Sequence, residues 1–150
     1  MKVPIAIRVL RHGDETTLAR VAPGVFDDAV DEHATRLFLS DPRHHLVVAI
    51  EGATVVGFAS AVHYVHPDKP HPELWINEIG VAPTHRRRGV GRTLLASLIE
   101  LACNLGCAVA WVLTDRANTG AMRLYASVGG APSDQVIHTF HLTVPPGTGH

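Results

Sequence analysis

The chain has 150 residues, of which 46% are hydrophobic and 18% are charged, and its formal net charge is −1. This length and balance predict a single globular domain over residues 1–150, with a core that needs no metal or disulfide. A nearly neutral chain does not generally attract nucleic acid or an anionic membrane surface, so we expect neither as a partner. The sequence has no apolar run that could span a bilayer and no signal-like start, so we expect a cytoplasmic protein.

Neither cysteines nor histidines predict a metal site. Cys103 and Cys107 are four residues apart, outside any C-x-x-C pair, and are expected to be free thiols. His63, His66 and His71 are close in sequence, but they lie among prolines and beside no C-x-x-C or H-E-x-x-H pattern. No metal is therefore expected, and the role of this histidine cluster is left open.

The first half of the chain predicts a strand, two helices and a hairpin. Residues 5–10 are rich in branched apolar side chains, as in a strand. Asp14 is a plausible N-cap for a helix to residue 22, and a second helix is expected over residues 31–40. The apolar runs 46–50 and 53–63 flank a Glu-Gly turn and predict a hairpin.

The second half predicts alternating strands and helices after a proline-rich loop. Strands are expected over residues 74–81, 108–114 and 136–142. A helix ending at Gly106 should connect the first two of them, and Asn118 should cap a helix that ends near Gly129. This order predicts an α/β fold with a mixed sheet, in which strands 74–81 and 108–114 are parallel through a crossover helix.

The segment from Val81 to Arg92 leaves a predicted strand and opens a predicted helix. The first N–H groups of a helix are unpaired and lie at the positive end of its dipole, so this position suits a phosphate. Gly89 and Gly91 permit close backbone approach, and the arginines at positions 86 to 88 add positive charge. The segment has neither the G-K-[ST] of a Walker loop nor the dinucleotide G-x-G-x-x-G. By itself, it also fits a basic capped helix whose glycine pair is accidental.

Two spaced motifs carry a family resemblance. Residues 86–91, Arg-Arg-Arg-Gly-Val-Gly, match [QR]-x-x-G-x-[GA]. Asn118, Ala121, Tyr125 and Gly129 match N-x-x-A-x-x-x-Y-x-x-x-G. Together they make the chain resemble the GNAT acetyltransferase family from residue 5 to residue 142. The resemblance implies a mixed, mostly antiparallel central sheet with one splayed parallel strand pair and flanking helices.

The resemblance also implies that acetyl-CoA is the cosubstrate and binds where the strands near Val81 and Thr114 separate. The loop N–H groups would hold its pyrophosphate, and the strand before the loop would pair with its pantetheine arm. Asn118 and Tyr125 would face the thioester. The expected cofactor-binding residues are Ile79, Val81, Arg86, Arg87, Arg88, Gly89, Val90, Gly91, Arg92 and Asn118. The family often has an aromatic or aliphatic residue where this chain has Gly130, a difference expected to affect packing.

Glu78 and Tyr125 are the expected catalytic residues. Acetyl transfer needs a neutral amine and a proton for the departing thiolate. Glu78 lies on the strand that leads into the segment from Val81 to Arg92. It could accept the amine proton, or it could be a structural carboxylate held by other groups. Tyr125 matches the family position that protonates the sulfur, and its ordinary pKa near 10 suits that role, although it could also simply fill the core. The N–H of Val81 should stabilise the thioester oxygen.

The acceptor is predicted to be a small cationic amine. Within the family the chain looks most similar to aminoglycoside 3-N-acetyltransferases and uncharacterised bacterial relatives, through residues that include Phe26, Asp28, Glu78 and Asp115. Acidic side chains could form a rim that attracts a polycation, or they could be ordinary solvated charges: Asp27, Asp28, Asp31, Glu32, Glu73 and Asp115. Asp28, Glu73 and Asp115 are the expected acceptor-binding residues.

Two other functions fit the same residues. A protein N-terminal acetyltransferase shares both motifs, but that group usually has a Glu where this chain has Leu113. A non-catalytic acyl-CoA-binding module is the alternative from another class. Neither the acceptor nor the oligomeric state follows from the sequence, although the last strand could provide the edge of a homodimer.

Overall fold

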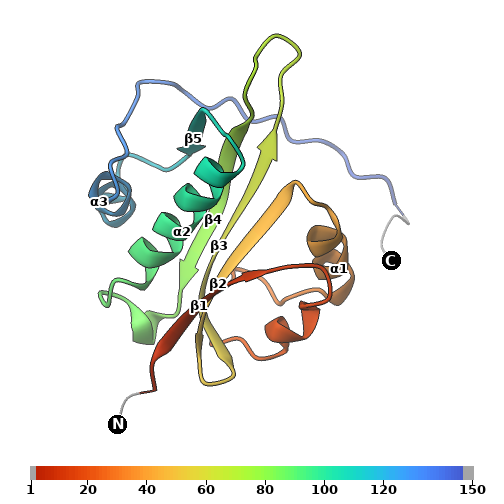
Figure 1. Ribbon diagram of the computed structural model, residues 1–150, viewed down its shortest axis with the longest axis vertical. Helices are drawn as coiled ribbons and strands as arrows, with labels where there is room; N and C mark the ends of the chain where they lie inside the picture. The colour runs from red at the N-terminus through yellow and green to blue at the C-terminus, as the bar shows by residue number, and fades with distance from the viewer. Residues whose placement is uncertain (1–2, 147–150) are drawn as a thin grey trace.

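The structure is a computed structural model that describes residues 3–146 (Figure 1). Within that range five strands form one sheet in the order β1-β2-β3-β4-β5. They are β1 (Ile5–Leu10), β2 (His44–Glu51), β3 (Thr54–Tyr64), β4 (Glu73–Val81) and β5 (Val109–Val112). Neighbouring strands are antiparallel except for β4 and β5, which are parallel. The predicted mixed sheet with its parallel pair is therefore confirmed.

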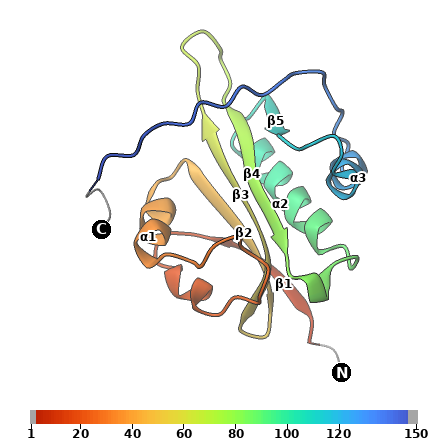
Figure 2. The same ribbon diagram turned by 180° about the vertical axis from the view of Figure 1, so that it is seen from behind.

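Helices lie on both faces of the sheet (Figures 1 and 2). Helix α2 (Val90–Asn104) connects β4 to β5 and packs on β2, β3 and β4, with α3 (Thr119–Ser127) beside it. The other face carries the 3-10 helix η1 (Glu15–Ala19) and α1 (Glu32–Ser40), and the short η2 (Pro83–His85) precedes α2. In the described part of the chain no helix is long and apolar enough to cross a membrane.

The core lies mainly between α2 and the centre of the sheet. Leu94, Leu95 and Leu98 recur on one face of α2 and are at most 2% exposed. Burying each such side chain contributes about 1.5–3 kcal/mol. Val47 and Val48 of β2 are both fully buried although they point to opposite faces, because helices cover the sheet on both sides.

Two glycines allow these layers to approach the β3–β4 pair closely. A Cβ atom on Gly57 would lie 3.1 Å from Val90 of α2. On the opposite face, a Cβ atom on Gly80 would lie 2.0 Å from the carbonyl oxygen of Val25. Any side chain at position 80 would therefore displace the segment before α1.

The predicted helix over residues 14–22 is wrong in its second half. Only Glu15–Ala19 is helical, as the single 3-10 element η1. Val55 N donates to Arg20 O at 2.8 Å, and Ala22 N donates to Val55 O at 2.9 Å. Because β3 captures this segment as an extended chain, the helix cannot continue beyond Ala19.

The predicted strand over residues 136–142 is not observed. The segment is irregular, and alternate apolar side chains such as Val136 and Phe140 are 79% and 82% exposed. Strand β5 is also shorter than predicted, with four residues. β5 pairs only with β4, and the last segment pairs with no strand among residues 3–146.

Candidate active site

The parallel strands separate halfway along β4. The β4–β5 ladder joins only residues 73–76 to residues 109–112, whereas β4 remains paired with β3 to its end. Ala82 N donates to Val56 O on the β3 side at 2.8 Å. Because successive peptide groups of a strand point to opposite sides, the N–H groups of Ile79 and Val81 point into the opening. This open edge can pair with an extended chain such as the expected pantetheine arm.

The start of α2 lies at this opening. The first hydrogen bond of the helix is donated by Thr93 N to Gly89 O at 3.0 Å, so Val90, Gly91 and Arg92 have no helical acceptor for their N–H groups. Gly89 adopts the left-handed φ of 77°, and a Cβ atom there would meet no atom within 4 Å. The groups are therefore exposed to an anion and placed at the positive end of the helix dipole.

Glu51 braces the arginine-rich loop from the β2–β3 turn. Its Oε2 is 3.2 Å from His85 Nε2 and 3.8 Å from Arg88 Nη2. Arg86 Nε donates to Val81 O at 3.3 Å, and Arg87 has a positive φ of 61°, a strained conformation for a residue with a side chain. The sequence did not predict the role of Glu51, because it lies 34 residues before His85.

Helix α3 packs against the start of α2. A Cβ atom on Gly91 would contact Leu124 at 3.5 Å, so α3 lies directly beside the start of α2. Asn118 caps α3 as predicted, and its Oδ1 accepts from Ala121 N at 3.1 Å. The structure explains why glycine occupies position 130, because a Cβ atom there would lie 2.9 Å from the carbonyl oxygen of Tyr125.

Tyr125 is half-buried on α3 and packs against the core. Burial disfavours the phenolate and raises the pKa of Tyr125 above its ordinary value. The hydroxyl therefore stays protonated at neutral pH and can serve as a proton donor. The same packing is compatible with a structural contribution to the core.

Glu78 lines a cavity of about 330 Å³ on the α1 face of the sheet. Phe58 and Ser60 lie beside it on β3, and Asp28 closes the cavity from the segment before α1. A larger cavity of about 750 Å³ adjoins it between η1 and α1, but its lining includes neither Glu78 nor Tyr125. The smaller cavity is therefore the better candidate for the acceptor, because it places a carboxylate beside the open edge of β4.

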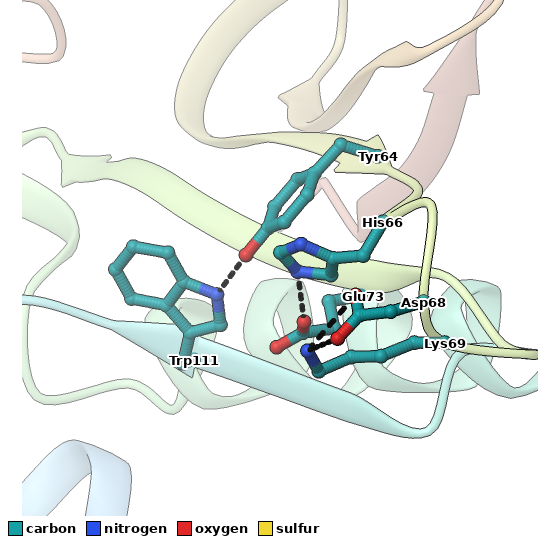
Figure 3. Close-up of polar contacts among 6 residues, drawn as sticks. All are labelled: Tyr64, His66, Asp68, Lys69, Glu73 and Trp111. Atoms are coloured by element: carbon teal, nitrogen blue, oxygen red, sulfur yellow. Dashed lines mark hydrogen bonds and ion pairs between the residues drawn. The ribbon is translucent and has the colours of Figure 1, made fainter.

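The three predicted acceptor-binding carboxylates are not gathered at one rim. Asp28 lines both cavities, while Glu73 and Asp115 lie outside them. Glu73 Oε2 is 2.5 Å from His66 Nε2 (Figure 3). Asp115 accepts from Ala117 N at 2.9 Å and shapes the turn before α3. The structure thus brings Asp28 together with Glu78 and gives the other two local partners.

The histidines take part in separate contacts. His45 Nε2 is 2.7 Å from His63 Nδ1, and burial, reinforced by His63, lowers the pKa of His45 to about 4. His66 instead contacts Glu73. Over residues 3–146 no group of three or more His, Cys, Asp or Glu side chains could hold a metal ion.

Comparison with known proteins gives consistent matches. The model of the acetyltransferase (GNAT) family matches residues 14–129. The chain is 34% identical to the N-alpha-acetyltransferase RimI of Mycobacterium tuberculosis, over 84% of this chain and 78% of that protein. It is 28% identical to the aminoglycoside N(6')-acetyltransferase type 1 of Salmonella typhimurium, over 77% of this chain and 81% of that protein.

A solved structure has the same fold. The aminoglycoside acetyltransferase meta-AAC0020, from an uncultured soil metagenomic sample and in complex with sisomicin, gives a TM-score of 0.80 at 18% identity. The match covers 93% of this chain and 97% of that chain.

These matches establish the family and refine the predicted likeness. The aminoglycoside enzyme matched by sequence is named for the N(6') position, whereas the sequence predicted a likeness to 3-N-acetyltransferases. The N-terminal acetyltransferase alternative also has a relative, RimI. The family model spans most of the chain, including both motifs that carried the resemblance. The chain belongs to the GNAT acetyltransferase family and is an acetyl-CoA-dependent N-acetyltransferase.

Proposed function

We propose that the chain acetylates a primary amine of a small cationic acceptor, a class that includes aminoglycosides. The observation that carries this proposal is the shared cavity of Glu78 and Asp28 beside the open edge of β4. Its volume of about 330 Å³ lies within the range of sites for small molecules. Four acidic side chains line this small cavity and favour a cation over a neutral or anionic acceptor: Asp27, Asp28, Asp31 and Glu78.

Some of these residues would bind acetyl-CoA, and others would transfer protons during the reaction. Acetyl-CoA supplies the acetyl thioester, and the N–H groups at the start of α2 fit its pyrophosphate. The N–H of Val81 is available to donate to the thioester oxygen. The Glu78 carboxylate accepts the proton of the attacking amine, and the Tyr125 hydroxyl donates a proton to the departing sulfur. Holding both substrates at one opening also lowers the entropic cost of their encounter.

The pH dependence of kcat/KM tests the role of Glu78. If Glu78 is the base, Glu78→Gln lowers kcat/KM by roughly 10²–10⁴-fold and removes the limb on which the wild-type rate rises with pH. Glu100→Gln is the matched control, because Glu100 is an exposed carboxylate on α2 outside the cavity. An acidic limb that is unaltered in the Glu78 variant would remove this residue from the mechanism.

The likeness to RimI favours a second candidate, acetylation of a protein N-terminus. Against it, Leu113 stands where that group usually has a Glu, and it is 46% exposed just after β5. Values of kcat/KM for sisomicin and for a peptide with a free N-terminal alanine separate the two candidates. A preference for the peptide would overturn the small-cation proposal.

We also propose that the chain forms a homodimer through its last segment. Val136, Phe140 and Leu142 expose alternate apolar side chains, and β5 leaves its outer edge unpaired among the described residues. Such an edge is a template for pairing with a second chain. Light scattering after size exclusion should show a dimer for the whole chain and a monomer after removal of residues 135–150. A monomeric whole chain would contradict this proposal.

A further inference from the structure

We propose that Trp75 and Trp111 form an aromatic subsite that holds a second cationic group of the acceptor, away from the reacting amine. The inference rests on the proposed function, because it extends the acceptor site from Glu78 along the same face of β4. Neither tryptophan belongs to the motifs of the phosphate loop or α3.

The β3–β4 ladder places Trp75 and Glu78 on one face. Ser60 pairs with Glu78 and Val62 pairs with Trp75. Ser60 and Val62 are two residues apart on β3, so their side chains point to the same face, as do those of their partners. Trp75 and Glu78 are three residues apart, and the bulge in this ladder absorbs the extra residue, Asn77. Without that bulge the two side chains would face opposite sides of the sheet.

The two indoles are held in a fixed arrangement. Trp111 pairs with Trp75 across the parallel ladder, and their rings stack with centroids 5.1 Å apart and an interplanar angle of 5°. Trp111 Nε1 donates to the hydroxyl of Tyr64 at 2.6 Å, across β4 (Figure 3). His66 packs its ring edge against Tyr64 and contacts Glu73. This network orients the aromatic rings without the help of the hydrophobic core.

Packing alone does not account for this cluster. Trp75 is 37% exposed, and neither indole is among the residues packed against the core. Helix α1 and η1 cover the other end of this face, next to Phe58 and Leu46 (Figure 2). The segment after α3 also crosses this face of β3 and β4 (Figure 2), yet Trp75 stays exposed and Trp111 partly exposed on the face that carries Glu78.

The surroundings of the cluster identify the chemistry of its occupant. The face of an indole attracts a cation more strongly than any other aromatic side chain does. Glu78 lies on the same strand face as Trp75 and supplies a carboxylate on one side of the cluster, while Glu73, on the other side, contacts His66. At about 3.3 Å per residue, Trp75 and Glu78 are roughly 7–10 Å apart along the strand. A preferred acceptor therefore carries a second cation at about that distance from its reacting amine.

Intrinsic fluorescence provides a direct test, because Trp75 and Trp111 are the only tryptophans of the chain. Sisomicin and spermidine, titrated without acetyl-CoA, should each change the emission saturably, with a midpoint near their KM. Butylamine, which has one cation, should leave the emission unchanged at equal concentration. Unchanged emission with both polycations would overturn the subsite.

Kinetics of Trp75 variants give a second test. Trp75→Leu should raise the KM for sisomicin about tenfold, equivalent to about 1.4 kcal/mol, and leave kcat and the KM for acetyl-CoA unchanged. Trp75→Phe should restore part of the affinity because it keeps a π face. Leu105→Ala is the matched control, since Leu105 is 38% exposed at the end of α2 and should change no parameter.

The outcomes distinguish the subsite from the proposed function. Turnover of sisomicin with an unchanged KM in Trp75→Leu would overturn the subsite alone. Absence of turnover with every small amine would overturn the proposed function and, with it, the subsite. Should Trp75→Leu fail to fold, the wild-type fluorescence titration decides.

Discussion

Replacing Gly89 with valine should weaken CoA binding much more than it destabilises the fold. Gly89 has φ 77°, and a Cβ atom added to it would have no neighbour within 4 Å, so the substitution costs backbone strain and no steric clash. That strain is about 1–2 kcal/mol, which lowers Tm by roughly 2–8 °C in a chain of this size. The added side chain would also occupy the space through which a phosphate approaches the exposed N–H groups. Losing one such charge-assisted hydrogen bond costs about 1.5–3 kcal/mol, or roughly 10- to 150-fold in Kd.

Gly106→Val separates strain from binding. Gly106 follows the other end of α2 with the same φ of 77° and the same empty surroundings, so its replacement carries a similar strain. Calorimetric titration with CoA should give a Kd at least tenfold weaker for the Gly89 variant and near the wild-type value for the Gly106 variant. Equal CoA affinity in folded Gly89→Val and wild-type protein would refute the proposed phosphate cradle.

Three further outcomes are expected. Tyr125→Phe should lower kcat by roughly 10- to 1000-fold with little change in CoA affinity, and an unchanged kcat would leave Tyr125 only a packing role. Glu51→Gln removes the brace on Arg88 and should raise the KM for acetyl-CoA more than it changes kcat; equal effects on both would exclude this positioning role. The pKa of His45 is lowered to about 4 in the folded chain. Between about pH 6.5 and 4 the unfolded chain therefore binds more protons than the folded chain, and the free energy of unfolding should decrease as the pH is lowered through that window. Urea melts at pH 7 and pH 5 should show this loss, and His45→Gln should reduce it.

Periodicity and capping predicted most of the fold because they act locally. The helix expected over residues 31–40 is observed as α1, and the helix expected before Gly106 is observed as α2. The two secondary-structure predictions that were wrong depend on pairing with residues distant in sequence. The helix after Asp14 is shortened by pairing with Val55, and the alternation over residues 136–142 predicts a strand, but this segment pairs with none of the described strands.

In the candidate site, too, local motifs were predicted from the sequence and contacts between distant residues were not. The helix start at Gly89 and the cap at Asn118 lie in contiguous motifs, so the sequence predicted both. The brace at Glu51 and the aromatic pair of Trp75 and Trp111 depend on sheet register across 34 or more residues. The bulge that turns Glu78 and Trp75 to one face is likewise a property of the ladder and has no signature in the local sequence.

We propose that this acetyltransferase serves a small cationic acceptor. The most direct test of this proposal supplies limiting acetyl-CoA to the purified protein with an equimolar mixture of sisomicin, spermidine, free amino acids and an alanine-terminated peptide. Mass spectrometry then identifies the acetylated product. We predict that the acetyl group is found on sisomicin or spermidine. Acetylation confined to the peptide or the amino acids, or no acetylated product at all, would contradict this claim.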